Sequence, residues 1–484
     1  MGIFITFAGC TTKHDTTEIP SFDWIESEQP IDFSWVQGVG AKSFPTQRIV
    51  NANTFGAVND TTILSTQAIQ TAIDECHKTG GGTVTLKPGD YATGALFVKE
   101  GVNLEISKGV TLYASTDILD YPEIRTRVAG IEMVWPSAVL NIIDTDNAAI
   151  SGEGLIDCRG EVFWNKYWQM RKEYEKEGLR WIIDYDCKRV RGILISNSTN
   201  ATLKSFTIMR TGFWGVQILY SKNCTADGIT VNNNIGGHGP STDGIDIDSS
   251  SSILIENCSI DCNDDNICLK AGRDADGLRV NRPTENIVVR GCSTGKGSGV
   301  ITCGSETSGG IRNVLAYNLR ANKTPTVLLI KSALTRGGFV ENIYMTDVIS
   351  DSARRIVAAD INWYPAYSYS KLPEKYEGQE VPEHWKTMLT PVEPKEKGYP
   401  QVRNIYLANV KATEADLFIT AAGLNDSLRL HNFQLYNLDV QAKRAGNITW
   451  SNGFILKDIQ LKTTENDRLV SENNTNMKIE IKYQ

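Results

Sequence analysis

Residues 286–294 read NIVVRGCST, residues 313–321 read NVLAYNLRA and residues 342–350 read NIYMTDVIS. The same pattern, an Asn or Ser followed by alternating apolar residues, also begins at Asn200, Asn223, Ser252 and Asn404. The first six copies begin 23, 29, 34, 27 and 29 residues apart. Each copy is typical of one or two short β-strands and contains no helical periodicity.

A repeat of this length cannot bury its apolar face alone, so successive copies must stack on one another. The pattern therefore predicts an all-β fold, a parallel β-solenoid in which each strand pairs with its equivalent one turn later. Asn side chains at equivalent positions should form ladders, and Cys258 and Cys292 should stack in the core. Blades of a propeller need about 40–45 residues each, which is longer than the observed spacing.

Three segments depart from the repeat. Residues 66–78 have apolar side chains at helical spacing and precede three glycines, which predicts a helix that caps the first turn. Residues 164–181 are charged and aromatic and predict a helical excursion. Residues 362–400 are rich in Trp, Tyr and Pro and predict a long loop that leaves the solenoid.

Length and composition limit the possible classes of protein. A chain of 484 residues exceeds the roughly 250–300 that one compact core organises, which indicates either several domains or a repeat array. The net charge of −8 argues against a nucleic-acid partner. No apolar run in the body of the chain approaches the roughly 18–20 residues of a membrane span. The nine cysteines after Cys10 show no pairing typical of a disulfide framework or a zinc site.

The N-terminal residues suggest an anchor. Residues 3–9 are apolar and run into Cys10, and Phe7-Ala8-Gly9-Cys10 resembles a bacterial lipobox. We expect a truncated signal over residues 1–10, lipidation of Cys10 and a location in a bacterial cell envelope, with the true start upstream. An incidental cysteine is the alternative. Residues 11–47 would then form an extension, 48–460 the solenoid and 461–484 its C-terminal end.

Acidic residues gather on successive turns. If Ile245, Ile267, Ile301 and Ile330 stack, Asp243 falls beside Asp265, with Asp264 adjacent and Lys331 two turns further along the same face. A protonated carboxyl and an ionised one are the groups that glycosidic hydrolysis requires, and crowding of like charges raises one pKa. Spacing alone leaves calcium binding open. Asp246 and Asp248 are expected to bond nearby backbone in turns.

Several stretches resemble glycoside hydrolase family 28, the polygalacturonases and rhamnogalacturonan hydrolases, over roughly residues 48–460. They are residues 51–60 (NANTFGAVND), 80–91 (GGGTVTLKPGDY), 151–164 (SGEGLIDCRGEVFW), 188–195 (KRVRGILI), 236–248 (GGHGPSTDGIDID), 262–272 (CNDDNICLKAG) and 330–343 (IKSALTRGGFVENI). The resemblance implies a right-handed parallel β-helix and an inverting hydrolase. It assigns Asp265 as general acid, and Asp243 and Asp264 as the pair that holds the nucleophilic water.

Two residues depart from the family pattern. Ser298 stands where polygalacturonases have a histidine, and Leu329 stands where they have an arginine. Both residues help the family to recognise galacturonate, so we expect weak cleavage of polygalacturonate and better cleavage of rhamnose-containing fragments. Rhamnogalacturonan hydrolases also lack the histidine.

Candidate substrate contacts lie around the acidic cluster. Lys331 can pair with a uronate carboxylate, supplemented by Lys296 and Arg336, with Arg354 and Arg355 as further cations on neighbouring turns. His238 could approach the cleft, or serve as a structural hydrogen-bonding group. Trp363, Trp385 and the tyrosines of the long loop could stack on sugars or pin the loop.

The sequence thus predicts an inverting glycoside hydrolase that acts on a pectic polymer or oligomer of galacturonate or rhamnogalacturonan type. The expected separation of the carboxyl groups is about 6.5–9.5 Å. No metal and no organic cofactor is implied. A calcium-dependent pectate lyase and a saccharide-binding β-helix without activity are the two alternatives.

Overall fold

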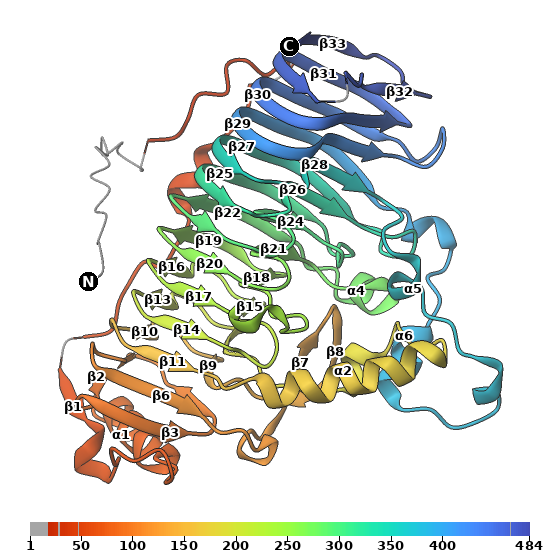
Figure 1. Cartoon of the computed structure of the whole chain (residues 1–484). Helices are drawn as coiled ribbons and strands as arrows, with labels where there is room; N and C mark the ends of the chain where they lie inside the picture. Colours follow the sequence, from red (N-terminus) through yellow and green to blue (C-terminus); the bar gives the residue numbers. More distant parts are fainter. Residues whose placement is uncertain (1–17, 28–29, 47, 465) are drawn as a thin grey trace, which may run out of the picture.

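A computed structural model describes residues 18–27, 30–46, 48–464 and 466–484, and Cys10 lies outside the described residues. The chain winds into a right-handed parallel β-helix, as predicted (Figure 1). Each turn contributes short strands to stacks that run the length of the coil. Backbone hydrogen bonds join the strands of each stack to their equivalents on the next turn. The sheet edges of one turn are therefore satisfied by the next turn.

Stack 1 contains the strands that follow the Asn or Ser anchors. It comprises β1 (Ile49–Asn51), β2 (Gly82–Thr85), β5 (Val102–Glu105), β10 (Ala149–Ser151), β13 (Thr202–Lys204), β16 (Thr225–Asp227), β19 (Ser251–Glu256), β22 (Thr284–Arg290), β25 (Ile311–Asn322), β27 (Phe339–Asp351), β29 (Gln401–Ala422), β30 (Leu430–Thr449), β31 (Ser451–Thr463) and β33 (Lys478–Tyr483).

Stack 2 lies one bend further along each turn. It comprises β3 (Gly89–Thr93), β6 (Val110–Ala114), β11 (Leu155–Asp157), β14 (Thr207–Met209), β17 (Thr230–Asn232), β20 (Ser259–Asp261) and β23 (Ser293–Thr294). From β25 onward, single long strands continue from stack 1 into stack 2.

Stack 3 carries the candidate site. It comprises β4 (Leu96–Val98), β9 (Leu140–Ile143), β12 (Ile193–Ser196), β15 (Val216–Leu219), β18 (Ile245–Asp248), β21 (Ile267–Lys270), β24 (Ile301–Cys303), β26 (Thr326–Lys331), β28 (Arg355–Asp360) and β32 (Val470–Glu472). The inward side chains of the three stacks form one continuous apolar core.

The repeated Asn anchors stabilise the bends of the coil. They adopt left-handed backbone conformations, with φ of 60° at Asn286, 55° at Asn313 and 56° at Asn342. Asn tolerates this region better than most side chains, which explains its recurrence. The predicted ladder is confirmed, because the side-chain amides of Asn313, Asn342, Asn404 and Asn432 each donate to the Asn one turn earlier, at 3.0, 3.2, 3.0 and 2.8 Å.

The predicted capping helix is α1 (Thr66–Lys78). It buries Ile69, Ala72, Ile73 and Cys76 against the first turn and ends just before Gly80. The helix thereby covers apolar core that the end of the coil would otherwise expose. The nine cysteines of the described residues are buried and free, as expected, and Cys258 and Cys292 are neighbours.

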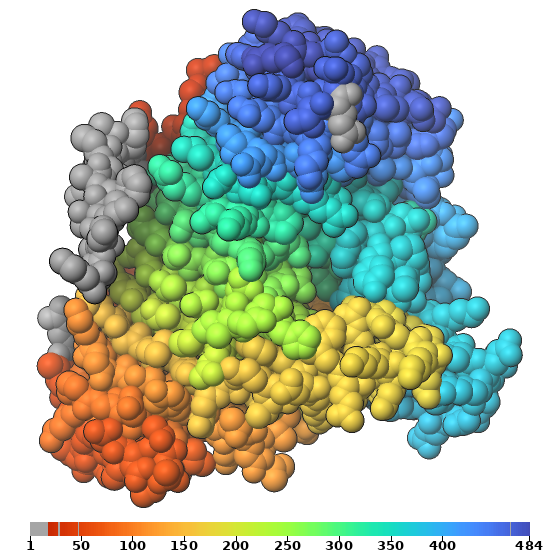
Figure 2. Space-filling model, in the orientation of Figure 1, coloured from red at the N-terminus to blue at the C-terminus, as the bar shows by residue number. Residues whose placement is uncertain are grey.

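Excursions from the coil gather beside stack 3. They include a hairpin of β7 (Glu123–Val128) and β8 (Ile131–Pro136), then α2 (Glu161–Lys176) and α3 (Ile183–Asp186), which fall in and after the predicted helical excursion. Residues 361–400 form the long loop, with α5 (Pro365–Ser368) and α6 (Glu383–Leu389). In Figure 2 the yellow α2 segment and the cyan loop project from the same side of the coil. The remaining helical segments are α4 (Asp274–Val280), η1 (Ser34–Gly38), η2 (Ala52–Phe55), η3 (Ile118–Asp120), η4 (Ile235–Gly237), η5 (Glu374–Tyr376) and η6 (Lys395–Gly398).

Residues 18–27 and 30–46, which we call the strap, run along the outside of stack 1 (Figure 1, red). At one end, the backbone of Glu26 exchanges two hydrogen bonds of 2.8 Å with the side chain of Gln434. At the other end, the Gly40 N–H donates to Ser252 O at 2.9 Å. The strap therefore spans turns that are far apart in sequence. In the described part of the chain, no helix is both long and apolar enough to cross a membrane.

Candidate active site

The site is built on the outward face of stack 3, where four strands lie side by side. Ile245, Ile267, Ile301 and Leu328 form one inward row. The prediction that Ile330 belongs to this row is wrong, because Ile330 pairs with Cys303. A strand repeats every two residues, so a two-residue slip leaves the same side chains inward and cannot be detected from the pattern. Lys331 still faces outward.

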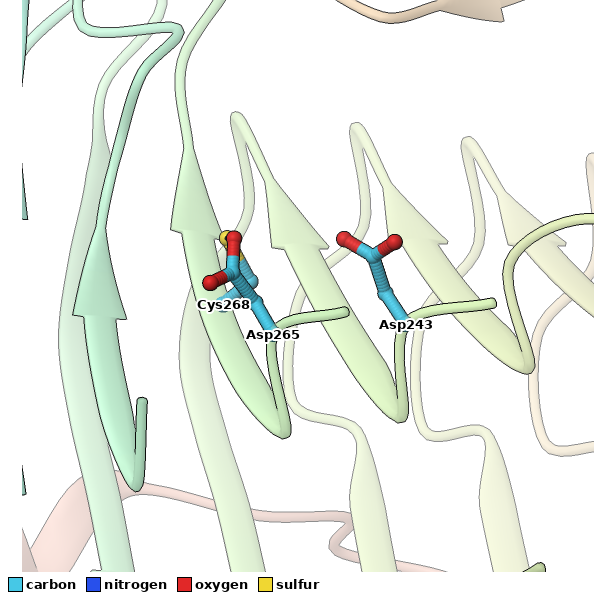
Figure 3. Close-up of side chains that lie close together, drawn as sticks. All are labelled: Asp243, Asp265 and Cys268. Atoms are coloured by element: carbon cyan, nitrogen blue, oxygen red, sulfur yellow. The ribbon is translucent and has the colours of Figure 1, made fainter. Parts of the chain in front are cut away.

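Three carboxyls meet at the beginning of these strands. Asp243 lies just before β18, while Asp264 and Asp265 lie just before β21, the next strand in the stack. Figure 3 shows the side chains of Asp243 and Asp265 on adjacent turns, pointing to the same side of the coil. An oxygen of each and the Sγ of Cys268 lie within 4.8 Å of one another. Asp243 and Asp265 are buried, and Asp264 is partly exposed.

Two lysines hold this carboxyl cluster. The Nζ of Lys331 lies 2.7 Å from Asp265 Oδ2, and the Thr302 hydroxyl donates to Asp265 Oδ1 at 3.0 Å. The Nζ of Lys270 lies 3.4 Å from Asp243, 3.3 Å from Asp246 and 3.5 Å from Glu306. Both lysines are almost fully buried. They offset the repulsion between carboxylates that are crowded in a region of low dielectric.

The electrostatics favour retention of a proton in the cluster. Burial, followed by the charges of Asp243 and Asp265, raises the pKa of Asp264 to about 8. Burial and the charge of Asp246 raise the pKa of Asp243 well above its ordinary value, against the opposing effect of Lys270. Coupled carboxyls share their protons, so the group as a whole stays partly protonated near neutral pH. This is the condition that a general acid requires.

The prediction that Asp246 and Asp248 bond nearby backbone in turns is wrong. Both lie within β18 on its outward face, which the β7–β8 hairpin covers. Asp246 is in ion-pair range of Lys270, and burial raises its pKa to about 7. Asp248 pairs with Arg127 of β7 at 2.9 Å, and both side chains are fully buried. Asp248 thus joins the coil to the hairpin, while Asp246 faces a lysine on the next strand of the coil.

A pocket opens above the cluster. Its base holds the three aspartates with Lys270, Lys331 and Glu306, and its walls include Arg180, Asp184, Phe213, Trp214, Trp363 and Tyr367. The wall residues from 180 to 184 belong to the α2–α3 segment, and Trp363 and Tyr367 belong to the long loop. Segments remote in sequence therefore complete a site that begins on adjacent turns of the coil.

The aromatic residues of the long loop serve two different purposes. Trp385 is 6% exposed and packs edge-on against Trp181 at 5.6 Å, which pins the loop to the α2–α3 segment. Trp363 instead lines the pocket, with its ring 4.6 Å from the Lys331 ammonium. Trp385 thus pins the loop, whereas stacking of Trp363 on a sugar stays a prediction.

The other candidate contacts lie outside the pocket. His238 is exposed, and its ring stacks on that of Trp168 with 5.1 Å between the centroids. Lys296 is also exposed, and neither residue lines the pocket. Arg336 is completely buried, where it donates to Ser305 O at 3.0 Å and pairs with Asp274. Direct contact of Arg336 with substrate does not fit this burial. Its cationic head instead satisfies buried acceptors under the loop.

Ser298 and Leu329, the two departures from the family pattern, both lie close to the carboxyl cluster. The Ser298 N–H donates to Asp264 O at 2.8 Å. Leu329 pairs with Thr302, the residue whose hydroxyl binds Asp265, and is 7% exposed. An apolar side chain therefore stands beside the acidic cluster at this point, and it contributes no positive charge.

Sequence reasoning missed Lys270, Glu306, Arg180, Asp184 and Trp214. Only Lys270 carried a local signal, because it is a charged residue at the end of the otherwise apolar strand ICLK. The others reach the pocket from loops and excursions whose path the repeat pattern does not define. Trp214 supports Lys270 directly, with its ring 4.9 Å from the ammonium.

Comparisons with known proteins agree on one family. Residues 92–368 match the family model described as glycosyl hydrolases family 28. A probable polygalacturonase of Vitis vinifera is 30% identical over 304 residues, which cover 60% of this chain and 58% of the relative. The exo-poly-alpha-D-galacturonosidase of Dickeya chrysanthemi is 27% identical over 375 residues, covering 68% and 60%. The chain thus matches less than two thirds of the length of these two relatives.

Solved structures share the fold. An exopolygalacturonase from Thermotoga maritima superposes with a TM-score of 0.65 and 24% identity, over 92% of this chain and 94% of the other. A family 28 exopolygalacturonase from Yersinia enterocolitica gives a TM-score of 0.70 and 21% identity, over 90% and 79%. At this level of identity the likeness establishes the β-helix and not the substrate.

Proposed function

Because the chain belongs to glycosyl hydrolases family 28, we propose that it is a glycoside hydrolase that cleaves pectic galacturonan with water as the nucleophile. The observation that carries the proposal is the convergence of Asp243, Asp264 and Asp265 at the base of one pocket. Polygalacturonases among the relatives support the choice of substrate.

The proposed roles follow from the family resemblance, and they require that the proton which the cluster retains near neutral pH passes to Asp265. Asp265 gives a proton to the glycosidic oxygen as the bond to the anomeric carbon breaks. Asp243 and Asp264 accept a proton from the water that attacks the same carbon from the opposite face. A cluster that retains a proton near neutral pH supports an acid role for one of its members.

One oxygen of Asp243 and one oxygen of Asp265 lie within 4.8 Å of each other. The roughly 6.5–9.5 Å expected for an inverting pair refers to the separation of the whole carboxyl groups, so that expectation stays a prediction. One water that accepts or donates at about 2.7–2.8 Å on each side can bridge a gap of this size. Inversion therefore rests on the resemblance, and the anomeric configuration of the product must be measured.

The walls of the pocket favour attack at a chain end. The β7–β8 hairpin, the α2–α3 segment and the long loop share one apolar cluster that includes Trp135, Trp181 and Trp385. We infer that this wall blocks one end of the pocket, so that a terminal sugar would enter it more readily than the middle of a polymer. The names of the relatives do not decide the matter, since an endo-polygalacturonase of Pectobacterium parmentieri is 28% identical over 66% of this chain.

The charges in the pocket do not favour the calcium-dependent lyase alternative. Calcium takes six to eight oxygen ligands. Here the ammonium groups of Lys270 and Lys331 already lie among the carboxylates, at 2.7 to 3.5 Å. A divalent cation in the same space would be repelled by both. A binding protein without activity has no need for this proton-sharing cluster.

Product analysis tests the proposal. The purified protein is incubated with polygalacturonate, with galacturonate oligomers and with rhamnogalacturonan fragments, with and without chelator, and reducing ends and unsaturated products are measured. We expect saturated products that are released from chain ends, independently of chelator, with the anomeric form followed by proton NMR. Unsaturated products, or affinity without turnover, would refute hydrolysis.

We further propose that the mature protein is lipid-anchored in a bacterial envelope through Cys10. The support is the sequence Phe7-Ala8-Gly9-Cys10 alone. In the bacterium that expresses the protein, Cys10→Ser should move it from the membrane fraction to the soluble fraction or block its processing. Unchanged fractionation of the variant would contradict the anchor.

A further inference from the structure

The pocket contains one cation whose charge is not used by the carboxyl cluster. Within the described part of the chain, its cationic lining residues are Arg180, Lys270 and Lys331. Lys331 pairs with Asp265 at 2.7 Å, and Lys270 lies 3.4 Å from Asp243. Both ammonium groups thus offset catalytic carboxylates. Arg180 approaches none of these aspartates within ion-pair distance.

The partner of Arg180 leaves an excess of positive charge. Its Nη1 donates to Asp184 Oδ2 at 2.8 Å, and the same carboxylate accepts from Arg189 Nη2 at 3.0 Å. Although burial opposes ionisation, the charges of Arg180 and Arg189 lower the pKa of Asp184 to about 2. One carboxylate is therefore shared by two guanidinium groups. Arg189 is completely buried, so Arg180 presents the unbalanced charge to the pocket.

The guanidinium is positioned but not saturated. Its side chain is 14% exposed and lies over the rings of Tyr364 at 5.6 Å and Tyr367 at 5.0 Å. Among the described residues, no acceptor takes a hydrogen bond from its Nε, and Glu175 is 4.0 Å away and pairs with Arg171 at 2.7 Å. A fixed guanidinium with unused donors is suited to a planar carboxylate.

We propose that Arg180 binds the carboxylate of a uronate residue in the pocket and determines specificity for acidic sugars. This inference rests on the proposed function. Arg180, in the α2–α3 segment, would then provide the positive charge that the coil lacks at Leu329. A charge on this wall would restore uronate recognition, and it revises the expectation that polygalacturonate is a poor substrate.

The test compares trigalacturonate with its methyl ester, which has the same rings without the negative charges. Arg180→Gln should lower kcat/KM for trigalacturonate roughly 10- to 100-fold, mainly through KM, because it removes a charged partner in a desolvated site. Cleavage of the ester should change much less. Calorimetry gives a second measurement, in which the variant should lose the preference of the wild type for galacturonate over galactose.

Arg171→Gln is the matched control. Arg171 lies in the same excursion and pairs with Glu175, but does not line the pocket. Its variant should stay within about twofold of the wild type on both substrates, because an ion pair near the surface contributes little. Arg180→Lys, which keeps the charge and loses the fork, should retain part of the preference for the acid. It also provides the comparison if Arg180→Gln does not fold.

The outcomes separate this inference from the proposed function. If the wild type cleaves neither substrate nor any other pectic chain, the proposed function fails. If the wild type cleaves trigalacturonate and Arg180→Gln lowers kcat/KM equally for the acid and for the ester, Arg180 has a structural role and the inference fails. Unchanged kinetics in Arg180→Gln would also overturn the inference. So would an Arg180→Lys variant that cleaves trigalacturonate no better than its methyl ester.

Discussion

Two outer faces of the same coil are covered by segments that leave the repeat, and the coverings differ in chemistry. The strap covers stack 1 with apolar contacts, in which Phe22 and Val36 pack on Val288, Leu315 and Tyr344. The excursions beside stack 3 instead cover a row of charged side chains and leave a pocket above it. The first covering removes apolar surface from water, while the second removes water from charges.

This difference indicates how stability and chemistry are divided between the faces. Apolar burial contributes about 25 cal/mol per Å² and requires no particular pairing. Buried charges are stabilised only by specific partners, and they make each partner energetically costly to remove. We therefore expect substitutions in the strap to change stability without changing activity, and substitutions of the charged groups in the pocket to change activity.

The largest effect is expected for Asp265→Asn. The amide keeps the shape of the side chain but cannot donate the proton, so kcat should fall by roughly 10²- to 10⁴-fold. The change in unfolding free energy should be small, because Lys331 loses its ion pair while the repulsion among the carboxylates is relieved. Initial rates on the best pectic oligomer and urea unfolding measure the two quantities.

The control for this variant is Asp261→Asn. Asp261 lies at the end of β20, near the cluster in sequence, but does not line the pocket. Its variant should retain nearly full activity. If Asp265→Asn kept more than about a tenth of the wild-type rate, Asp265 would not be the general acid.

The fold was predictable because its information is local and repeated. Each Asn anchor specifies a left-handed bend, and each following strand alternates in and out, so the sequence of residues 286–350 already predicts stacked turns. The capping helix was equally local. The strap was not predicted, because nothing within residues 18–46 indicates that Glu26 lies beside Gln434, 408 positions away.

The site was predictable only where it follows the coil. Asp243 and Asp265 come together because β18 and β21 are adjacent strands, which the repeat indicates. Arg180 and Trp363 reach the pocket through excursions, and their positions depend on contacts such as that of Trp181 with Trp385. Those contacts are long-range and have no period. The mistaken register of Ile330 has a related cause, because the alternating pattern defines which face of the strand a side chain is on but not which residue it pairs with.

A smaller and pH-dependent effect is expected for Asp246→Asn. The pKa of Asp246 is about 7 in the folded protein and near its ordinary value of 3.8 when unfolded, so the folded state binds more protons between these values. Its contribution to stability is therefore lost as pH rises from about 4 through about 7, by at most ~1.4 kcal/mol per pH unit. The variant should show a flatter dependence of unfolding free energy on pH, as measured by urea unfolding between pH 5 and 8 in about one-unit steps.

The same variant should shift the activity profile. Removal of the Asp246 charge lowers the pKa of Asp243, for which that charge is the main cause of elevation after burial. Asp243 then ionises at lower pH, and the acidic limb of kcat/KM against pH should move to lower pH. An unchanged slope of stability together with an unchanged acidic limb would show that Asp246 does not titrate in this range.

The smallest effect on activity is expected for Phe22→Ala in the strap, where the comparison between the two faces is sharpest. Phe22 is 6% exposed and meets Tyr344 edge-on at 5.5 Å. Its truncation should lower the free energy of unfolding by about 3 kcal/mol, as for other buried aromatics. The rate measured well below the unfolding temperature should stay within about twofold, since the strap covers stack 1 and the pocket lies on stack 3. Phe44 belongs to the same strap and is 45% exposed, so Phe44→Ala should change neither quantity measurably. A loss of activity in Phe22→Ala that exceeds its loss of folded protein would mean that the strap supports the pocket through the coil, and the two faces would then not be independent.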